Sequence, residues 1–290
     1  MHWEKEAEEI VENMAVPPMM ARFARLDAER RAWQKGLEMI TPAIAKATEK
    51  GYARVFGPEA TEVIRRMGRG EDVGLPDAFF EDDENELFKI ELCPAQYGAC
   101  TAQKRNMMLT VLLPLRAKLK ELNTTRIILE KALTPLMSHH VLRVAIIGCP
   151  NCCTTPYFAD FGIICQLRPA AKPEGCTQCQ ACVRCCTEGA ITLNNGNPVI
   201  DYDRCVMCGG CEKECAKAVI TLKDTGYKVV IGGTGSRHPH IAQTASGWTD
   251  AAGAVALLEK FITAYRNFPV EKNEISFHQL VSLLGIEAFQ

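Results

Sequence analysis

The sequence predicts an α+β protein that consists of a helical N-terminal domain and a half-domain of strands and helices with an inserted cysteine-rich module. Apolar residues recur at helical spacing through the first part of the chain, and "VLRVAIIG" (141–148) and "YKVVIGG" (227–233) have strand character. Two similar cysteine runs lie between these strands. We therefore expect a helical domain at 1–68, a linker at 69–87, the half-domain at 88–171, the insert at 172–224, and the closing strand and helices of the half-domain at 225–290.

Composition excludes several classes of protein. The chain has 290 residues, 47% of them hydrophobic, and a formal net charge of −2. This charge argues against a nucleic-acid partner, because phosphate binding usually brings a basic surplus. No run reaches the roughly 18 apolar residues of a membrane span, and the start "MHWEKEAEEI" is acidic where a secretion signal is basic and then apolar. We therefore expect a cytoplasmic protein.

The N-terminal helices are predicted from spacing and from proline and glycine. "EKEAEEIVENMA" (4–15) repeats apolar residues every three or four positions, and "PPMMARFARLDAERRAWQKG" (17–36) sets Leu26 and Trp33 on one apolar face. "TPAIAKATEKG" predicts a third helix with Thr41 as its N-cap and Gly51 as its end. The segment "RGEDVGLPDAFFEDDENEL" (69–87) is typical of a linker.

Two cysteine runs repeat one spacing. Fifteen cysteines do not indicate disulfides in a cytosolic chain of this size, because the cytosol keeps thiols reduced. "CTQCQACVRCCTEGA" (176–190) and "CVMCGGCEKECAKAV" (205–219) both contain C-x-x-C-x-x-C-x-x-x-C. Structural zinc would also use four thiolates per site, but this doubled spacing favours two 4Fe-4S clusters.

The fourth cysteine of each run completes the other cluster in two-cluster ferredoxins. We therefore assign one cluster to Cys176, Cys179, Cys182 and Cys215, and the second to Cys205, Cys208, Cys211 and Cys186. Thr187 and Ala216 stand where the bacterial motif has proline, which removes no ligand. Between the runs, "AITLNNGNPVIDYD" (190–203) predicts a β-hairpin.

A second kind of cysteine set lies outside these runs. "CPAQYGAC" supplies Cys93 and Cys100, and "GCPNCC" supplies Cys149 and Cys153 directly after a buried strand. Four thiolates suffice for a third 4Fe-4S cluster. We expect Cys165 and Cys185 to act as small apolar residues, and Cys152 either to do the same or to serve as an alternative ligand.

"VAIIGCPNCCTTPYFADFGII" (144–164) resembles the 4Fe-4S domain of the nitrite and sulfite reductase family. The resemblance implies that Cys93 with Cys100 and Cys149 with Cys153 hold a cluster, and that the Cys153 sulfur bridges to a siroheme iron. In the C subunit of anaerobic sulfite reductase and its relatives a two-cluster ferredoxin follows the "DFGI" strand, as here, and "GGTGSRHPHIAQTASGWTD" (232–250) is similar to their closing segment. The likeness covers about residues 88–270 and implies a sulfite-reductase-like half-domain with a ferredoxin insert.

Two departures from the family pattern bear on function. The first cysteine pair is spaced C-x6-C where the family usually has C-x5-C. In addition, the residues before Cys93 do not resemble the arginine-bearing half that holds siroheme and the anion in these reductases. The candidate cations for those tasks here are Lys104, Arg105, Arg143, Arg237 and His238; His139 and His140 are more typical of a surface before a strand.

The first 68 residues also have a resemblance. "W-x-x-E-A-E", "VPPMMARFAR" and "G-x-x-x-IT" are similar to the small helical domain that ends one subunit of the light-independent protochlorophyllide reductase. That enzyme handles a tetrapyrrole beside an iron-sulfur cluster, which agrees with the siroheme expectation.

Two functions follow from these patterns. The first is a siroheme-dependent oxidoreductase in which two ferredoxin clusters feed a third cluster for reduction of sulfite or nitrite. The second is a siroheme-free electron-transfer subunit of a larger redox complex. Either implies three 4Fe-4S clusters, an electron-donor protein or subunit, a homo-oligomer or redox complex, and an anaerobic organism.

Overall fold

A computed structural model describes residues 1–16, 21–71, 73–74, 86–97, 100–133, 138–172, 174–269 and 274–290. The chain forms two compact units. The first comprises residues 1–80 and 94–105, and the second comprises residues 81–93 and 106–290. Helices and strands both occur, as expected for the α+β class.

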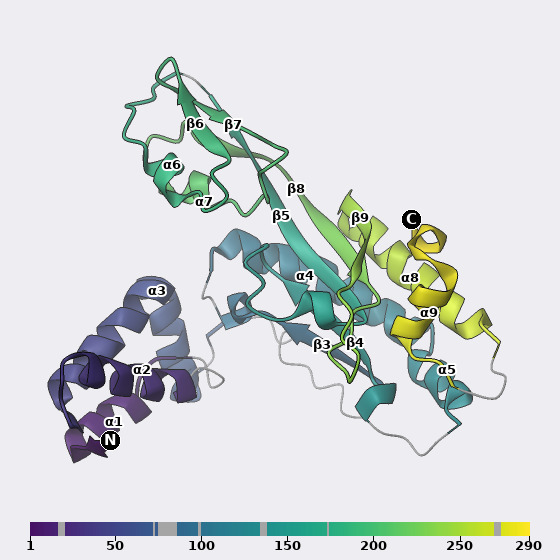
Figure 1. Ribbon diagram of the computed structural model, residues 1–290, viewed down its shortest axis with the longest axis horizontal. Helices are drawn as coiled ribbons and strands as arrows, with labels where there is room; N and C mark the ends of the chain where they lie inside the picture. The colour runs from purple at the N-terminus through teal and green to yellow at the C-terminus, as the bar shows by residue number, and fades with distance from the viewer. Residues whose placement is uncertain are drawn as a thin grey trace. The chain divides into compact units, whose positions relative to one another are not determined.

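The first unit is a small helical domain (Figure 1). Its helices are α1 (Lys5–Glu12), α2 (Ala21–Gln34) and α3 (Pro42–Gly68), and β1 (His2–Trp3) pairs in parallel with β2 (Met39–Ile40). Its core contains residues from all three helices: Ala7, Val11, Ala24, Ala28, Ala32, Ile44 and Ala45.

Two details of these helices differ from expectation. Trp33 is 72% exposed and Leu26 is 48% exposed, because α2 turns its alanines inward. Gly51 lies inside α3, and the helix is interrupted at Gly57, whose φ of 83° lies in the left-handed region. Of the expected linker, residues 72 and 75–85 lie outside the described residues.

A five-stranded mixed sheet organises the second unit. Its order is β3 (Phe88–Leu92), β4 (Leu142–Ile147), β5 (Phe161–Ala171), β8 (Ile220–Ile231) and β9 (Gln243–Thr249). The first three strands are parallel, whereas β8 is antiparallel to both β5 and β9. The carboxyl ends of β3 and β4 therefore lie side by side, and Cys93 and Cys149 follow those ends.

Helices contribute apolar residues to the core of this unit. The predicted helix after Cys100 is α4 (Ala102–Glu121), which buries Met108, Leu112, Leu115 and Leu119 and continues through Pro114. The next helices are α5 (Thr124–Lys131), α8 (Ala251–Asn267) and α9 (Phe277–Leu284). Phe261 of α8 lies with its ring 5.9 Å from that of Phe161 on β5. Short 3₁₀ helices cover 94–97, 138–140, 156–158 and 286–289.

The cysteine-rich insert is carried by the long strands β5 and β8, which extend beyond their neighbours in the sheet (Figure 1). It contains α6 (Ala181–Cys185), the antiparallel hairpin β6 (Ile191–Asn194) and β7 (Asn197–Ile200), and α7 (Gly210–Glu214). The predicted hairpin is thus present. β8 runs without a break across the expected boundary at 224.

No helix among the described residues combines the length and the apolar character that crossing a membrane requires.

Candidate metal centres

The first ferredoxin-type cage contains the four cysteines that the sequence assigns to one cluster. Cys176, Cys179, Cys182 and Cys215 line a single cavity, together with apolar residues that include Leu193, Pro198 and Ile220. Three cysteines come from the loop and first turn of α6. Cys215 arrives from the end of α7, so the two halves of the repeat cross over.

The second cage is built in the same way. Cys205, Cys208 and Cys211 come from the loop and first turn of α7, and Cys186 follows α6. All four line one cavity, which is closed on one side by Pro169 of β5. Each cavity offers the four thiols that a 4Fe-4S cluster needs, and Cys185 also lines the second cavity.

The repeat also extends to the backbone. Gln178 and Met207 have φ values of 58° and 56°, and each lies two residues after the first cysteine of its run. Their N–H groups donate to the Sγ atoms of Cys176 and Cys205, both at 3.4 Å. A left-handed residue at this point turns the loop so that the backbone faces the sulfur.

Further N–H donors face the fourth cysteines. The N–H of Ala190 lies 3.3 Å from Cys186 Sγ, and that of Ile220 lies 3.5 Å from Cys215 Sγ. Hydrogen bonds to cluster sulfurs offset their negative charge and raise the reduction potential. The fold therefore presents donors to thiolates, the form in which cysteine binds iron.

The pKa values of the free thiols show what the metal must supply. Burial, with the nearby Cys185, Cys208 and Cys205, raises the pKa of Cys211 to about 12. Burial likewise raises the pKa of Cys182, with Cys215 and Cys176 as the neighbouring thiols. Such thiols stay protonated at neutral pH unless a cation replaces the proton, so binding of the clusters must release protons.

A third group of cysteines lies at the carboxyl ends of β3 and β4. Cys93 is 5% exposed, and its Sγ accepts a hydrogen bond from the N–H of Gly148 at 3.3 Å. Cys149 follows Gly148 directly. Adjacent parallel strands thus bring together two cysteines that lie more than fifty residues apart in the sequence.

The rest of "GCPNCC" forms an irregular turn around Cys152 and Cys153. Cys152 has a φ of 50°, and Asn151 Nδ2 lies 3.2 Å from Cys153 Sγ, which is exposed. Burial raises the pKa of Cys152, and the nearby Cys149 and Cys153 act in the same direction. The Thr154 Oγ1 atom, one residue after Cys153, is buried and has no hydrogen-bond partner among the described residues.

The family follows from comparison with known proteins. The family description "Nitrite and sulphite reductase 4Fe-4S domain" matches residues 125–290, which is more than half of the chain. The chain belongs to this family. The matched description is that of a 4Fe-4S domain, in agreement with the cysteine sites of the second unit.

Individual relatives match shorter regions. The C subunit of the anaerobic sulfite reductase of Salmonella typhimurium is 38% identical over 74 residues, which cover 24% of this chain and 21% of the relative. The coenzyme F420-dependent sulfite reductase of Methanocaldococcus jannaschii is 46% identical over 95 residues, 33% of this chain and 15% of the relative. The matched part is thus about a fifth or less of these curated relatives.

Two solved structures are similar at low identity. Dissimilatory sulfite reductase I has a TM-score of 0.39 at 14% identity, over 51% of this chain and 41% of that chain. The Mycobacterium tuberculosis NirA protein has a TM-score of 0.35 at 14% identity, over 69% of this chain and 26% of that chain. The family match begins at residue 125, so the resemblance of residues 1–68 to protochlorophyllide reductase stays a prediction.

The predicted anion contacts of this reductase-family chain belong to both compact units. Cys100, Lys104 and Arg105 belong to the first compact unit, so their role at the third cluster stays a prediction. Arg237 and His238 are exposed on the segment between β8 and β9.

Arg143 is not beside the cysteines. It lies at the start of β4, about 13 Å of strand before Ile147. Its guanidinium donates to the carbonyl of Phe158 at 2.6 Å, and its backbone N–H donates to Asp160 Oδ2 at 2.8 Å. These bonds hold Arg143 at the far end of the strand, and its role as an anion contact stays a prediction.

Two cations near the cysteines were not predicted from the sequence. Burial raises the pKa of Cys152, and the charge of Lys228 on β8 offsets part of this rise; Lys228 Nζ lies 3.4 Å from the Tyr157 hydroxyl. Burial also raises the pKa of Cys205, and Arg168 of β5 offsets part of that rise; its guanidinium lies 4.6 Å from the ring centroid of Trp248. Lys228 and Arg168 each lie between buried residues of a strand. The face to which each side chain points depends on the strand register, which the cysteine motifs do not indicate.

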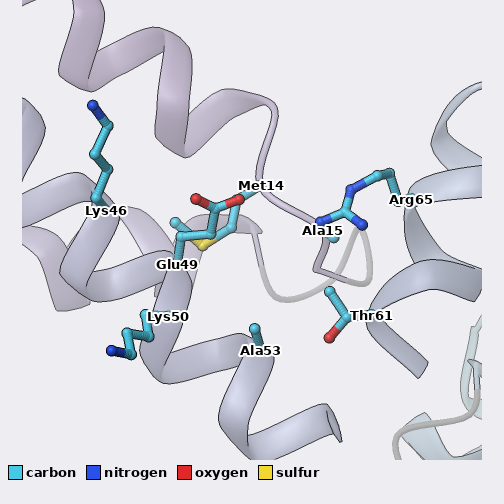
Figure 2. A pocket seen from close by; sticks show the side chains of 8 residues that line it. All are labelled: Met14, Ala15, Lys46, Glu49, Lys50, Ala53, Thr61 and Arg65. Carbon is cyan, nitrogen blue, oxygen red and sulfur yellow. The ribbon is translucent and has the colours of Figure 1, made fainter. Parts of the chain in front are cut away.

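The helical unit has a pocket of its own (Figure 2). It is lined by Met14, Ala15, Lys46, Glu49, Lys50, Ala53, Thr61 and Arg65. Lys46 lies 3.4 Å from Glu6, and Arg65 lies 2.7 Å from Glu62, so both charges have acidic partners. The Thr61 hydroxyl donates to the Gly57 carbonyl. These pairings do not favour an anion site here.

Proposed function

We propose that this chain passes electrons through two ferredoxin-type 4Fe-4S clusters to a third 4Fe-4S cluster coupled to siroheme, for the reduction of sulfite or a similar anion. The observation that carries the proposal is the order of the three cysteine groups along one strand, β5. Sulfite reduction needs electrons one at a time, and a linear series of centres can deliver them.

β5 connects the groups in space. Its residue Ile164 pairs with Ile147, which ends β4 just before the third group. Three residues on, the N–H of Leu167 donates to the carbonyl of Met207 at 2.8 Å, within the loop of the second cage. The first cage lies farther along, where Lys172 N–H donates to the carbonyl of Val219. Electrons would therefore enter at the cage of Cys176 and leave the ferredoxin module at the cage of Cys205.

The residues of the third group fit the roles that the family resemblance gives them. Cys93, Cys100, Cys149 and Cys153 would hold the cluster, and the exposed Cys153 would share its sulfur with siroheme. Siroheme supplies the iron on which the anion is reduced. Lys228 would draw the anion toward the cysteine turn by its charge, and the Tyr157 hydroxyl beside it could hold a proton.

A complete site would need a second protein surface. The arginine-bearing half of such reductases has no counterpart in the first 92 residues, and Lys228 is the cation that we place nearest the turn. We propose that a second copy or another subunit supplies the remaining cations and that a separate protein donates the electrons. The Salmonella typhimurium relative is by its name one subunit of an anaerobic sulfite reductase.

A second function is supported by the position of Arg143, which is bound to Phe158 and Asp160 rather than offered to an anion. If Arg143 keeps these bonds and does not bind an anion, the chain would serve as a siroheme-free electron-transfer subunit. The three clusters and their order would be unchanged.

Turnover distinguishes these two functions. Anaerobically purified protein is mixed with reduced methyl viologen, and its oxidation is followed after addition of sulfite or nitrite. The enzyme proposal predicts anion-dependent oxidation that Cys153→Ser abolishes and Cys165→Ser leaves intact. Viologen oxidation that depends on neither anion, also when the proposed partner subunit is present, would favour the electron-transfer function.

A further inference from the structure

A group of potential metal ligands lies away from the cysteine sites. His139 and His140 end the 3₁₀ helix that precedes β4, and Glu274 precedes α9. His140 Nε2 lies 3.3 Å from Glu274 Oε2, and His139 Nε2 lies 3.9 Å from Glu274 Oε1. One ligand atom from each residue lies within 4.8 Å of the other two. Residues 134 positions apart thus converge on one point.

The surrounding structure orients this group. The backbone N–H of Leu133 donates to Glu274 Oε2 at 2.8 Å, which fixes the carboxylate. The His140 side chain is 7% exposed, and its ring lies 4.1 Å from that of His139. Ligands held in this way by outer hydrogen bonds and burial are typical of metal sites in proteins.

We propose that His139, His140 and Glu274 bind one divalent cation of the borderline class, for which Zn²⁺ is the test ion. Two imidazoles and one carboxylate are a donor set that Zn²⁺ and similar ions prefer. Ligands at about 2.1 Å from a tetrahedral ion are about 3.4 Å from one another. The 3.3 Å separation from His140 Nε2 to Oε2 already matches this, whereas the 3.9 Å separation from His139 Nε2 is to the other oxygen, Oε1. Since the three ligand atoms lie within 4.8 Å of one another, the widest pair needs a closure of at most about 1.4 Å.

A fourth coordination position is available. The three side chains line a cavity of about 200 Å³ together with Tyr265, Ser276 and Gln279. This space admits a water or a small ligand opposite the protein donors. The ion would therefore have three protein ligands and one open position.

The charges around the group permit a cation. Lys131 also lines the cavity, but its ammonium donates to the carbonyl of Phe268, and burial lowers its pKa. A hydrogen bond between His140 and Glu274 would explain the position of His140 alone, but not that of His139. His139 converges on the same carboxylate although its side chain is 65% exposed, and a shared cation accounts for both contacts.

Bound metal would connect the start of β4 to the start of α9. It would constrain a loop of more than a hundred residues that includes the whole ferredoxin insert, and so stabilise the second unit. This role does not depend on the proposed sulfite chemistry.

The test uses the full, cluster-loaded protein, so that the cysteines are already occupied by iron. Equilibrium dialysis against buffered ⁶⁵Zn²⁺ at about 10 µM free ion measures zinc per chain, and iron is counted in the same samples. We expect one zinc per wild-type chain. Glu274→Gln retains an acceptor for the Leu133 N–H. This variant and, separately, His139→Ala should each weaken zinc binding at least about tenfold at unchanged iron content.

His240→Ala is the matched control, because His240 and His278 form a second close histidine pair, with ring centroids 4.2 Å apart. This variant should bind zinc as the wild type does. X-ray absorption at the zinc edge should show nitrogen and oxygen neighbours only. Sulfur in the zinc shell, zinc uptake unchanged by Glu274→Gln, or no uptake by the wild type would each overturn the proposal.

Discussion

Asp160 is a buried carboxyl group whose pKa is raised to about 6, because burial disfavours its charged form. The N–H of Arg143 donates to it and offsets only part of this cost. The native state therefore binds the Asp160 proton more tightly than the unfolded state does. Its contribution to stability is full below the unfolded pKa of 3.8 and is lost as the pH rises through about 6.

Asp160→Asn should remove this pH dependence. The amide oxygen still accepts from Arg143, and no charge is buried at neutral pH. We expect the variant to be more stable than the wild type at pH 7 by about 3 kcal/mol and nearly equal to it below pH 4. Anaerobic urea unfolding at several pH values measures this, and a parallel pH dependence in both proteins would contradict it.

Lys228 sets the charge beside the cysteine turn. Lys228→Met removes a cation that stabilises the more negative, reduced state of the third cluster, so its midpoint potential should fall by some tens of millivolts. An EPR-monitored redox titration measures the potential, with Lys260→Met on α8 as the control. An unchanged potential in Lys228→Met would place the third cluster away from this turn.

At the scale of elements, β5 holds the cysteine turn close to the sheet. A Cβ added at Gly162 would lie 2.6 Å from the carbonyl oxygen of Pro156 and 2.7 Å from the Val230 side chain, whereas one at Gly247 of β9 meets nothing within 4 Å. The absence of a side chain at Gly162 therefore lets the segment after the cysteines return across β5.

Gly162→Ala should destabilise the protein by about 1–3 kcal/mol, because the backbone carbonyl cannot move without shifting the turn. Gly247→Ala, in the neighbouring strand region, should change stability little. Thermal unfolding of the two variants and the wild type makes the comparison. Equal midpoints for all three would show that the turn does not press on β5.

The crossing of α6 and α7 predicts how clusters are lost. Cys176→Ala with Cys215→Ala removes two ligands of one cage, so we expect a loss of about four irons. Cys176→Ala with Cys186→Ala removes one ligand from each cage, and about eight irons should be lost. Iron and sulfide counts on anaerobically purified protein measure these losses. A larger loss in Cys176→Ala with Cys215→Ala than in Cys176→Ala with Cys186→Ala would assign each fourth cysteine to the cluster of its own run.

Cysteine spacing and strand patterns predicted much of this arrangement. The ferredoxin hairpin, β4, β5, β8 and α4 follow from local sequence, because each has its own periodicity or turn signal. The orientation of α2 did not follow from local sequence. Its buried face consists of Ala24, Ala28 and Ala32, and small residues are buried in this way only where another helix approaches closely. The predicted helix end at Gly51 was also wrong. Gly51 lies inside α3, and the helix is interrupted at Gly57, which precedes Pro58.

For the whole molecule, the fold orders the redox groups as the sequence could not. Spacing alone assigned cysteines to cages, but the contact of Leu167 with the loop of Cys208 identifies which cage lies nearer the third group. Lys228 and Arg168 were missed for the same reason: their contacts come from strands distant in sequence. Arg143 was predicted to contact the anion because of its charge, and in the structure its guanidinium donates to the Phe158 carbonyl.

The central claim is a series of three 4Fe-4S clusters that ends beside siroheme. The most direct measurement is the iron and acid-labile sulfide content of anaerobically purified protein, with acid-acetone extraction of tetrapyrrole from the same sample. We predict about thirteen irons and about twelve sulfides per chain, with one extractable siroheme. About eight irons, with no loss on Cys153→Ser and no tetrapyrrole, would contradict both the third cluster and its coupling to siroheme.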